Sequence, residues 1–170
     1  MYDIIGDVHG YAHHLKSLLQ NLGYKKSNGG YVHPERKAIF TGDFINRGPQ
    51  IKKTIRIIRS MVENGNAMAI LVNHEINSII ADIKDKKGGP LVKPPIKNFI
   101  SVLKTLNAFS GNEEEWKSHR NWMRTLPLFL ELDGIRVIHA CWANHAVNYI
   151  RENIPEGKIK KNVFRKIYKK

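Results

Sequence analysis

This sequence contains almost no cysteine: Cys141 is the single example in 170 residues. A lone cysteine excludes an internal disulfide and favours a reducing compartment, so we predict a cytoplasmic protein. No arginine follows Cys141 in a phosphate-binding loop, as a cysteine-dependent phosphatase would require, and we expect a small packed residue there. The first residues predict a strand, so a signal peptide is not expected, and no apolar run is long enough to span a bilayer, so no membrane partner is expected either.

Acidic residues are scarce as well. The chain has 15 Asp and Glu against 28 Lys and Arg, which gives a formal net charge of +13. Residues 158–170 contain seven basic side chains and no acid. Dense positive charge attracts nucleic acids and other polyanions, although a solvated lysine-rich surface has the same composition. We predict one domain over residues 1–157 and a basic tail over 158–170, with weak polyanion binding by the tail as an alternative to plain solvation.

Internal repeats and domain linkers are absent, and apolar strands alternate with helical periodicity. Strands are expected at residues 2–5, 38–41 and 67–72, a hairpin at 128–138, and a loop or a small hairpin at 25–35. Helices are expected at residues 12–22, 51–64, 75–82, 96–109, 113–126 and 144–152. Residues 84–95 are rich in glycine, proline and lysine and predict an exposed loop. This order indicates an α/β layered fold with helices on both faces.

What the chain does contain is a set of polar motifs that each follow an apolar strand. They are Gly6-Asp7-Val8-His9-Gly10, Gly42-Asp43-Phe44-Ile45-Asn46-Arg47-Gly48, Asn73-His74-Glu75 and, after a fourth strand, His139. In α/β proteins such side chains meet at the carboxyl edge of the sheet. Carboxylate, amide and imidazole groups together suit Mn, Fe or Zn. The motifs therefore indicate a metal site.

Two metal ions would explain the number of these ligands. A pair of ions about 3.5–4 Å apart can bind a phosphate group and generate hydroxide from water, and it needs one carboxylate that bridges both ions. Asp43 is the natural bridge. Asp7 and His9 would complete the first site, and Asn73 and His139 would serve the second. The pattern thus points to a two-metal phosphoesterase.

At these motifs the chain resembles the calcineurin-like metallophosphoesterases, above all the phosphoprotein phosphatases and the bacterial diadenosine-tetraphosphate hydrolases. The family pattern is Gly-Asp-x-His-Gly, Gly-Asp-x-x-Asp-Arg-Gly and Gly-Asn-His-Glu, then a histidine after a strand, and the similarity runs from Met1 to about Trp142. The resemblance implies a four-layer αββα sandwich with its C-terminal strands partly missing. It also implies two divalent ions, Mn, Fe or Zn, that act on phosphoprotein Ser/Thr phosphomonoesters or on dinucleoside polyphosphates.

The resemblance assigns roles position by position. The implied metal ligands are Asp7, His9, Asp43, Asn73 and His139. The implied catalytic residues are His74, Asn46 and Arg47. Arg47 would grip a phosphate oxygen with its forked guanidinium, His74 would protonate the leaving oxygen, and Asn73 would also contact the substrate.

Three departures from the family pattern change the expected site. Asn46 replaces an Asp that pairs with the catalytic histidine, and an amide brings no charge to stabilise an imidazolium. Val72 replaces a glycine, whose backbone freedom a β-branched residue lacks. No late Gly-His segment follows His139, and His145 is close to it in sequence, so the second metal site is expected to lack a ligand unless His145 or water takes that position.

These departures leave two other classes of function open. One is a decayed or weakly active family member that binds a metal or a phosphorylated ligand without turnover. The other is a basic nucleic-acid-binding module that reuses the fold. The histidines outside the motifs, at positions 13, 14, 33 and 119, are expected to be ordinary surface residues.

Overall fold

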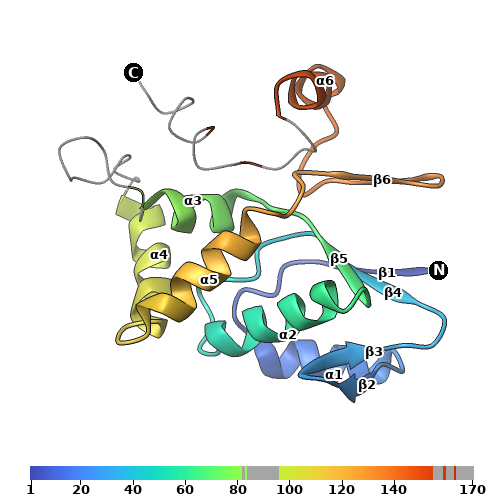
Figure 1. Cartoon of the computed structure of the whole chain (residues 1–170), viewed down its shortest axis with the longest axis horizontal. Helices are drawn as coiled ribbons and strands as arrows, with labels where there is room; N and C mark the ends of the chain where they lie inside the picture. The colour runs from blue at the N-terminus through green and yellow to red at the C-terminus, as the bar shows by residue number, and fades with distance from the viewer. Residues whose placement is uncertain (82, 84–95, 155–158, 160–162, 164–170) are drawn as a thin grey trace.

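A three-stranded parallel sheet forms the centre of the computed structural model, which describes residues 1–81, 83, 96–154, 159 and 163. The strand order is β1-β4-β5, with bounds Tyr2–Ile5, Lys37–Phe40 and Ala67–Ala69. The register pairs Ile5 with Phe40 and Phe40 with Ala69, so the three strands end level with one another. The loops that follow them therefore leave from one edge of the sheet (Figure 1).

Two helices cover one face of this sheet, and a small hairpin lies beside them. Their bounds are Ala12–Asn21 for α1, Ile51–Glu63 for α2, Lys25–Ser27 for β2 and Gly30–Val32 for β3. Ile55 and Ile58 of α2 are fully buried and share the main hydrophobic core with Phe40 of the sheet. The helical spacing of these apolar residues explains why this segment folds as an amphipathic helix against the sheet.

The opposite face of the sheet is covered by a hairpin. Its strands are β6 (Leu130–Leu132) and β7 (Ile135–Val137), which pair antiparallel as the Asp-Gly turn between them predicts. Val137 packs in a second, smaller core with Ile39 and Val72. The two cores lie on opposite faces of the sheet because successive side chains of a strand alternate between its faces.

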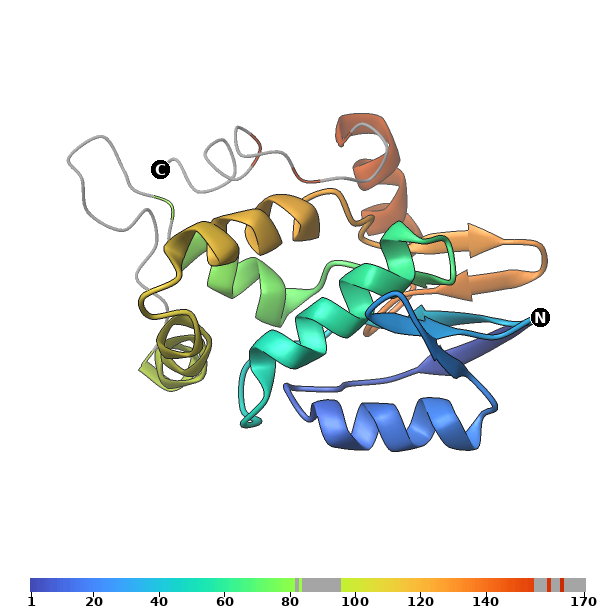
Figure 2. The same ribbon diagram turned by 60° about the horizontal axis from the view of Figure 1, so that its bottom comes forward.

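Helix α6 (Asn144–Asn153) lies beyond the hairpin. Arg151 of this helix forms an ion pair with Glu131 of β6 and lies over the ring of Phe129. Helices α1 and α2, the sheet, the hairpin and α6 thus follow one another in layers, as Figures 1 and 2 show from two directions. The expected αββα class is confirmed.

The remaining three helices form a group beside α2. They are α3 (Asn73–Ala81), α4 (Ile96–Ala108) and α5 (Glu113–Met123), and α4 packs against both α3 and α2. Helix α5 begins at a capping residue, Asn112, whose side chain accepts a hydrogen bond from the backbone N–H of Glu115. Three glutamates in its first turn suit the positive end of the helix dipole.

Three expectations from the sequence are wrong. The third strand was expected to reach Val72, but β5 ends at Ala69 because the backbone N–H of Leu71 donates to the carbonyl oxygen of Pro127 instead of continuing the ladder. Cys141 is exposed rather than packed. His119 is buried at 4% exposure, with its ring 5.6 Å from that of Phe109.

Most of the predicted basic tail and all of the expected 84–95 loop lie outside the described residues. Ile159 is described, and it is buried in the main core with Val163 packed against it. Position 159 therefore adds apolar contacts to the fold, and the domain boundary at 157 stays a prediction. Among the described helices, none has the length and apolar character needed to cross a membrane.

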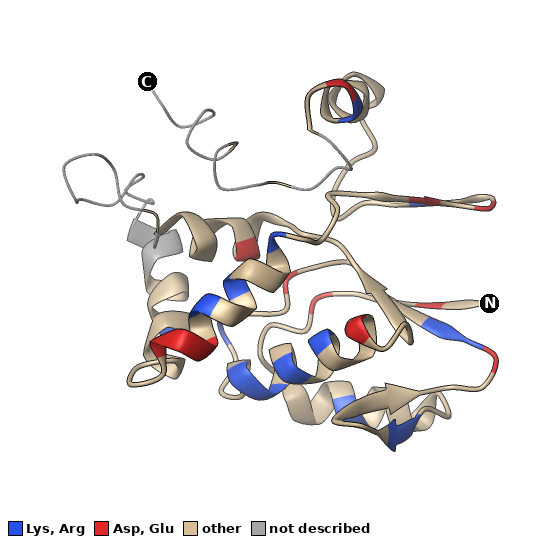
Figure 3. Ribbon diagram, viewed as in Figure 1, with Lys and Arg blue, Asp and Glu red and all other residues tan. Residues whose placement is uncertain are grey.

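Basic residues gather on α2, whereas α5 carries basic residues together with three glutamates (Figure 3). Acidic neighbours offset part of this charge, since Arg56 and Glu115 approach to 2.6 Å and Arg59 and Glu63 to 2.8 Å. Such surface pairs contribute little to stability. They do reduce the positive field of α2.

Val72 is accommodated by the glycine that faces it. The φ angle of Val72 is not positive. The backbone conformation that was expected to favour glycine at position 72 therefore does not occur here. Gly42 has a φ of +96°, and a Cβ added to it would lie 2.3 Å from Cγ2 of Val72. The side chain at position 72 therefore occupies the space that a side chain at position 42 would need.

Gly42→Ala should therefore destabilise the fold by about 2–4 kcal/mol, from overpacking and from a left-handed backbone at an L-residue. Val72→Ala combined with Gly42→Ala should recover the overpacking part, so that the double variant is more stable than the sum of the two single changes predicts. Urea unfolding of the three variants measures this. Strict additivity would show that Val72 does not depend on Gly42 for its space.

Candidate metal centre

The loops after β1 and β4 interlock at the edge of the sheet. The backbone N–H of His9 donates to the carbonyl oxygen of Asp43 at 2.8 Å, and that of Gly48 donates to the carbonyl oxygen of His9 at 2.7 Å. A Cβ on Gly48 would lie 2.4 Å from this oxygen of His9. Glycine at position 48 thus allows the two backbones to approach closely and brings the first two motifs together.

Backbone strain is concentrated in these loops. Five described residues other than glycine have positive φ, and four of them come from the predicted site: His9 (45°), Asp43 (52°), Asn46 (68°) and Arg47 (55°). Left-handed conformations cost an L-residue roughly 1–2 kcal/mol, less for Asp and Asn. Strain of this kind persists only where the surrounding structure enforces it, and it collects at functional sites.

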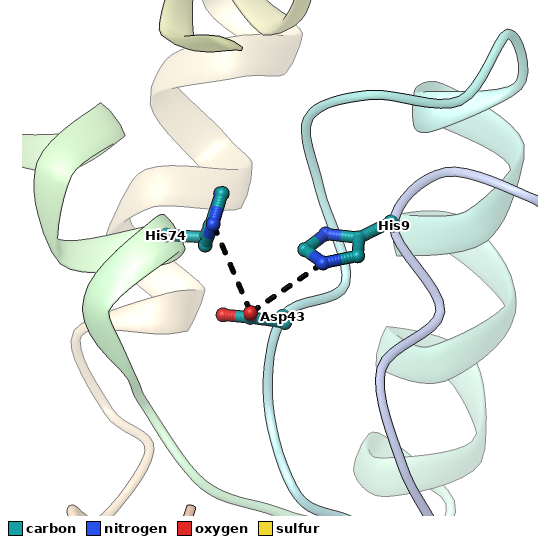
Figure 4. Close-up of side chains that lie close together, drawn as sticks. All are labelled: His9, Asp43 and His74. Atoms are coloured by element: carbon teal, nitrogen blue, oxygen red, sulfur yellow. Dashed lines mark ion pairs between the residues drawn. The ribbon is translucent and has the colours of Figure 1, made fainter. Parts of the chain in front are cut away.

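Asp43 lies at the centre of the site. Its Oδ2 is 3.6 Å from Nε2 of His9, 3.8 Å from Nε2 of His74 and 3.7 Å from Nε2 of His139. Figure 4 shows His9, from the loop after β1, and His74, from the start of α3, pointing toward Asp43 from two sides. Asp43 is 3% exposed, so this convergence occurs inside the protein.

Two groups of ligand-type side chains share Asp43. One consists of His9, Asp43 and His74, and the other of Asp7, Asp43 and His139; the ligand atoms of each group lie within 4.8 Å of one another. The structure therefore brings Asp7, His9 and His139 together around the carboxylate of Asp43. Asn73 is the first residue of α3, directly before His74, and it is exposed.

His9 and His139 are oriented by the same kind of contact, between Nδ1 and a backbone carbonyl oxygen. Nδ1 of His9 lies 3.1 Å from the carbonyl oxygen of Ile45, and Nδ1 of His139 lies 2.9 Å from that of Thr41. A carbonyl can only accept, so Nδ1 carries the proton in each neutral ring, and Nε2 then presents a lone pair toward Asp43. This is how ligating histidines are held in metalloproteins.

The residues fit a metal, because polar atoms at the centre have nothing else to bind. His9 Nε2 and Asp43 Oδ1 are buried without a hydrogen-bond partner in the described structure. Leaving such groups unsatisfied costs roughly 1–3 kcal/mol each, more for a charged group. Imidazole nitrogens and carboxylate oxygens are the donors that Mn, Fe and Zn take in proteins. A divalent ion would satisfy them.

Glu75 supports the site in a way that the sequence did not reveal. It is fully buried, and its carboxylate accepts hydrogen bonds from the backbone N–H groups of Asp43 (3.1 Å), Phe44 (2.8 Å) and Ile45 (3.4 Å). These bonds hold the strained loop that carries Asp43. The only signal in the sequence was an acidic residue inside the third motif, and nothing there showed which backbone it would bind.

His74 has a different surrounding from the other two histidines. Its Nδ1 lies 2.8 Å from Nδ2 of Asn46, the predicted partner. Burial lowers the pKa of His74, and the charges of His9 and Arg47 lower it further, while Asp43 and Asp7 act in the opposite direction. Arg47 is exposed beside this site, with Nζ of Lys104 bound to its carbonyl oxygen at 3.0 Å. His145, the weak substitute ligand, is exposed in the first turn of α6.

The stability of the metal-free chain should fall as pH rises toward 8. Burial raises the pKa of Glu75 to about 8, and Asp43 raises it too, against an ordinary value of 4.5. A raised acid pKa means that the folded state holds the proton more tightly than the unfolded chain does. The stabilisation is therefore complete below the unfolded value and is lost as pH rises through the folded value.

Urea unfolding of the metal-free protein across this interval measures the effect, with Glu75→Gln as the comparison. The variant should be less stable at low pH, because its amide N–H₂ would face the backbone N–H of Asp43, and its stability should vary less with pH. An unchanged slope in the variant would show that another group causes the dependence.

Comparison with known proteins identifies the group to which these features belong. A family model described as calcineurin-like phosphoesterase matches residues 2–166. A relative from Oceanobacillus iheyensis, named bis(5'-nucleosyl)-tetraphosphatase PrpE [asymmetrical], is 33% identical over 148 residues, which cover 85% of this chain and 58% of the relative. A relative of the same name from Bacillus subtilis is 40% identical over 74 residues, or 43% of this chain and 30% of that protein. The chain thus spans less than two thirds of the length of these relatives.

Solved structures show the same fold at low sequence identity. A variant of a cold-active protein tyrosine phosphatase matches with a TM-score of 0.60 at 16% identity, over 98% of this chain and 48% of that one. A candidate diadenosine tetraphosphatase matches with a TM-score of 0.50 at 17% identity, over 96% of this chain and 57% of that one. At this level of identity the likeness establishes the architecture alone.

Proposed function

Because the chain belongs to the calcineurin-like phosphoesterase family, we propose that it hydrolyses phosphate ester or anhydride bonds at a dinuclear metal centre built around Asp43. The observation that carries this proposal is the convergence of three imidazole Nε2 atoms on one oxygen of a buried carboxylate. A carboxylate shared by two ligand groups is what a bridged pair of ions requires.

We assign the metal ligands as the sequence predicted them: Asp7, His9, Asp43, Asn73 and His139. Bound divalent ions would supply a hydroxide nucleophile and neutralise phosphate charge. The protein's own part is to place the proton of the neutral His9 and His139 rings at Nδ1 through the carbonyl contacts there, which directs the Nε2 lone pairs toward the ions. Glu75 keeps the backbone of Asp43 in place, so that the bridging carboxylate is positioned before any ion arrives.

We assign Arg47 and His74 to the substrate. The exposed guanidinium of Arg47 lies beside the centre and can bind a phosphate oxygen with two parallel hydrogen bonds. Lys104 binds the carbonyl oxygen of Arg47 and so helps to hold its left-handed backbone. His74 faces Asp43 with Nε2, where it can donate a hydrogen bond to the leaving oxygen.

Dinucleoside polyphosphates are the substrate class that we favour. The relatives from Oceanobacillus iheyensis and Bacillus subtilis are named as tetraphosphatases of this kind. Phosphoprotein Ser/Thr phosphomonoesters, the other class implied by the sequence, have no support beyond the shared fold. A metal-binding member without turnover is the second candidate, and the uncharged Asn46 beside His74 is the observation that favours it.

Metal-dependent turnover tests the proposal. The purified chain, stripped with a chelator, should be inactive, and added manganese should restore hydrolysis of diadenosine tetraphosphate. Calorimetry with manganese in parallel reports binding separately from catalysis. Manganese binding without hydrolysis of diadenosine tetraphosphate or of 4-nitrophenyl phosphate would place the non-catalytic candidate first, and absence of binding would remove both.

A further inference from the structure

We propose that Thr105 is a positioning residue that sets the tautomer of His74 through the side chain of Asn46. Thr105 lies on α4, far in sequence from all the motifs, and both Thr105 and Asn46 are buried, at 0% and 1% exposure. The consequence for substrate choice, given below, rests on the proposed function; the tautomer itself does not.

Thr105 and Asn46 are joined by two hydrogen bonds. The hydroxyl oxygen of Thr105 accepts the backbone N–H of Asn46 at 3.1 Å. The same hydroxyl donates its proton to Oδ1 of Asn46 at 2.5 Å. The amide is thus fixed with its oxygen toward Thr105, and its other end, Nδ2, faces Nδ1 of His74 at 2.8 Å.

This orientation determines where His74 carries its proton. The amide nitrogen of asparagine is only a donor, so Nδ1 of His74 must accept and is unprotonated. The proton of the neutral ring then sits on Nε2, which faces Oδ2 of Asp43 at 3.8 Å. His9 and His139 have the opposite tautomer, because backbone carbonyls face their Nδ1 atoms.

The two tautomers give the histidines of this centre two different roles. His9 and His139 present Nε2 lone pairs and are suited to bind metal. His74 presents an N–H group and is suited to hydrogen-bond an anionic oxygen. An aspartate at position 46 would accept from Nδ1–H and would allow the doubly protonated ring, whereas the amide held by Thr105 opposes a proton at Nδ1.

A neutral Nε2–H can stabilise a departing oxygen by hydrogen bonding but is a poor source of a transferred proton. The site therefore suits leaving groups that depart as stable anions. The phosphate of a phosphoanhydride is such a group, and the alcohol of a phosphoserine is not. Thr105 and Asn46 together thus favour anhydride substrates over alkyl phosphomonoesters.

Nitrogen-15 NMR of the metal-free full chain tests the tautomer without any need for activity. At about pH 8, where an ordinary histidine is neutral, His74 should show a protonated Nε2 and an unprotonated Nδ1. His74→Gln identifies its signals. Thr105→Val removes the hydroxyl and frees the amide to turn, so the Nδ1-protonated form should appear. Thr105→Ser keeps the hydroxyl and should leave the tautomer unchanged. A protonated Nδ1 in the parent, or no change in Thr105→Val, would overturn the proposal.

Kinetics with two leaving groups test the consequence. Relative to 4-nitrophenyl phosphate, Thr105→Val should lower kcat on a phosphoserine peptide by about tenfold, because the neutral Nδ1-protonated ring presents a lone pair at Nε2 and no longer donates a hydrogen bond to the leaving oxygen. Thr105→Ser should not change this ratio. When Asn46→Asp is already present, adding Thr105→Val should leave the ratio of the two kcat values unchanged, because both oxygens of the carboxylate can accept a hydrogen bond. A change of this ratio in the double variant would show that Thr105 has only a structural role. If no variant turns over substrate, the proposed function fails, and the NMR result still decides the tautomer.

Discussion

Asp43→Asn is expected to abolish tight metal binding and to lower kcat by about three orders of magnitude or more. Asparagine suits the left-handed φ of 52° at this position, so the backbone should be retained. The change removes one negative charge from the point where three imidazoles converge. Metal ions stabilise developing charge by several kcal/mol, and each 1.36 kcal/mol is tenfold in rate.

Stability separates this loss from misfolding. Oδ1 of Asp43 is buried without a partner, and the carboxylate raises the pKa of the neighbouring Glu75. Removing its charge should therefore leave the metal-free protein at least as stable as the parent in urea. Asp133→Asn, at the exposed turn of the β6–β7 hairpin, is the matched control and should change neither property. Calorimetry with manganese that gives equal binding in Asp43→Asn would refute the metal assignment.

Asn46→Asp is expected to raise kcat on substrates with poor leaving groups by about 10–100-fold. A carboxylate 2.8 Å from Nδ1 of His74 would accept its N–H and favour the charged ring. Burial lowers the pKa of His74 in the parent, so little imidazolium is present near neutral pH. General acid–base catalysis is typically worth about 10²–10⁴-fold, which sets the scale of the gain.

The dependence on leaving group is the diagnostic measurement. The gain should be large on a phosphoserine peptide, smaller on 4-nitrophenyl phosphate and smallest on diadenosine tetraphosphate. Manganese affinity should change little, because Asn46 is not assigned as a ligand. Asn46→Ala, which removes the amide without supplying charge, is the control and should show no gain. An equal gain on all three substrates would mean that the aspartate acts on something other than proton donation.

The order of elements and the identity of the central residues could be predicted from the sequence. Helix α2 follows from its apolar spacing, the β6–β7 hairpin from its Asp-Gly turn, and the position of Asp43 from the polar motif that ends a buried strand. These features are local, since the periodicity of a segment reflects the face that it buries. Where burial depended on packing between distant segments, the expectation failed, as the exposed Cys141 and the buried His119 show.

The supporting contacts of the site were decided by tertiary structure alone. Glu75 binds a loop some thirty residues earlier in the chain, and Thr105 reaches Asn46 from a helix that carries no motif. The carbonyl oxygen of Thr41 orients His139 from the end of another strand. Backbone carbonyls and N–H groups are the same at every residue, so no sequence pattern indicates which of them a distant side chain will meet. The residue types at the centre could thus be predicted from the sequence, while their tautomers and orientations are determined only when the chain folds.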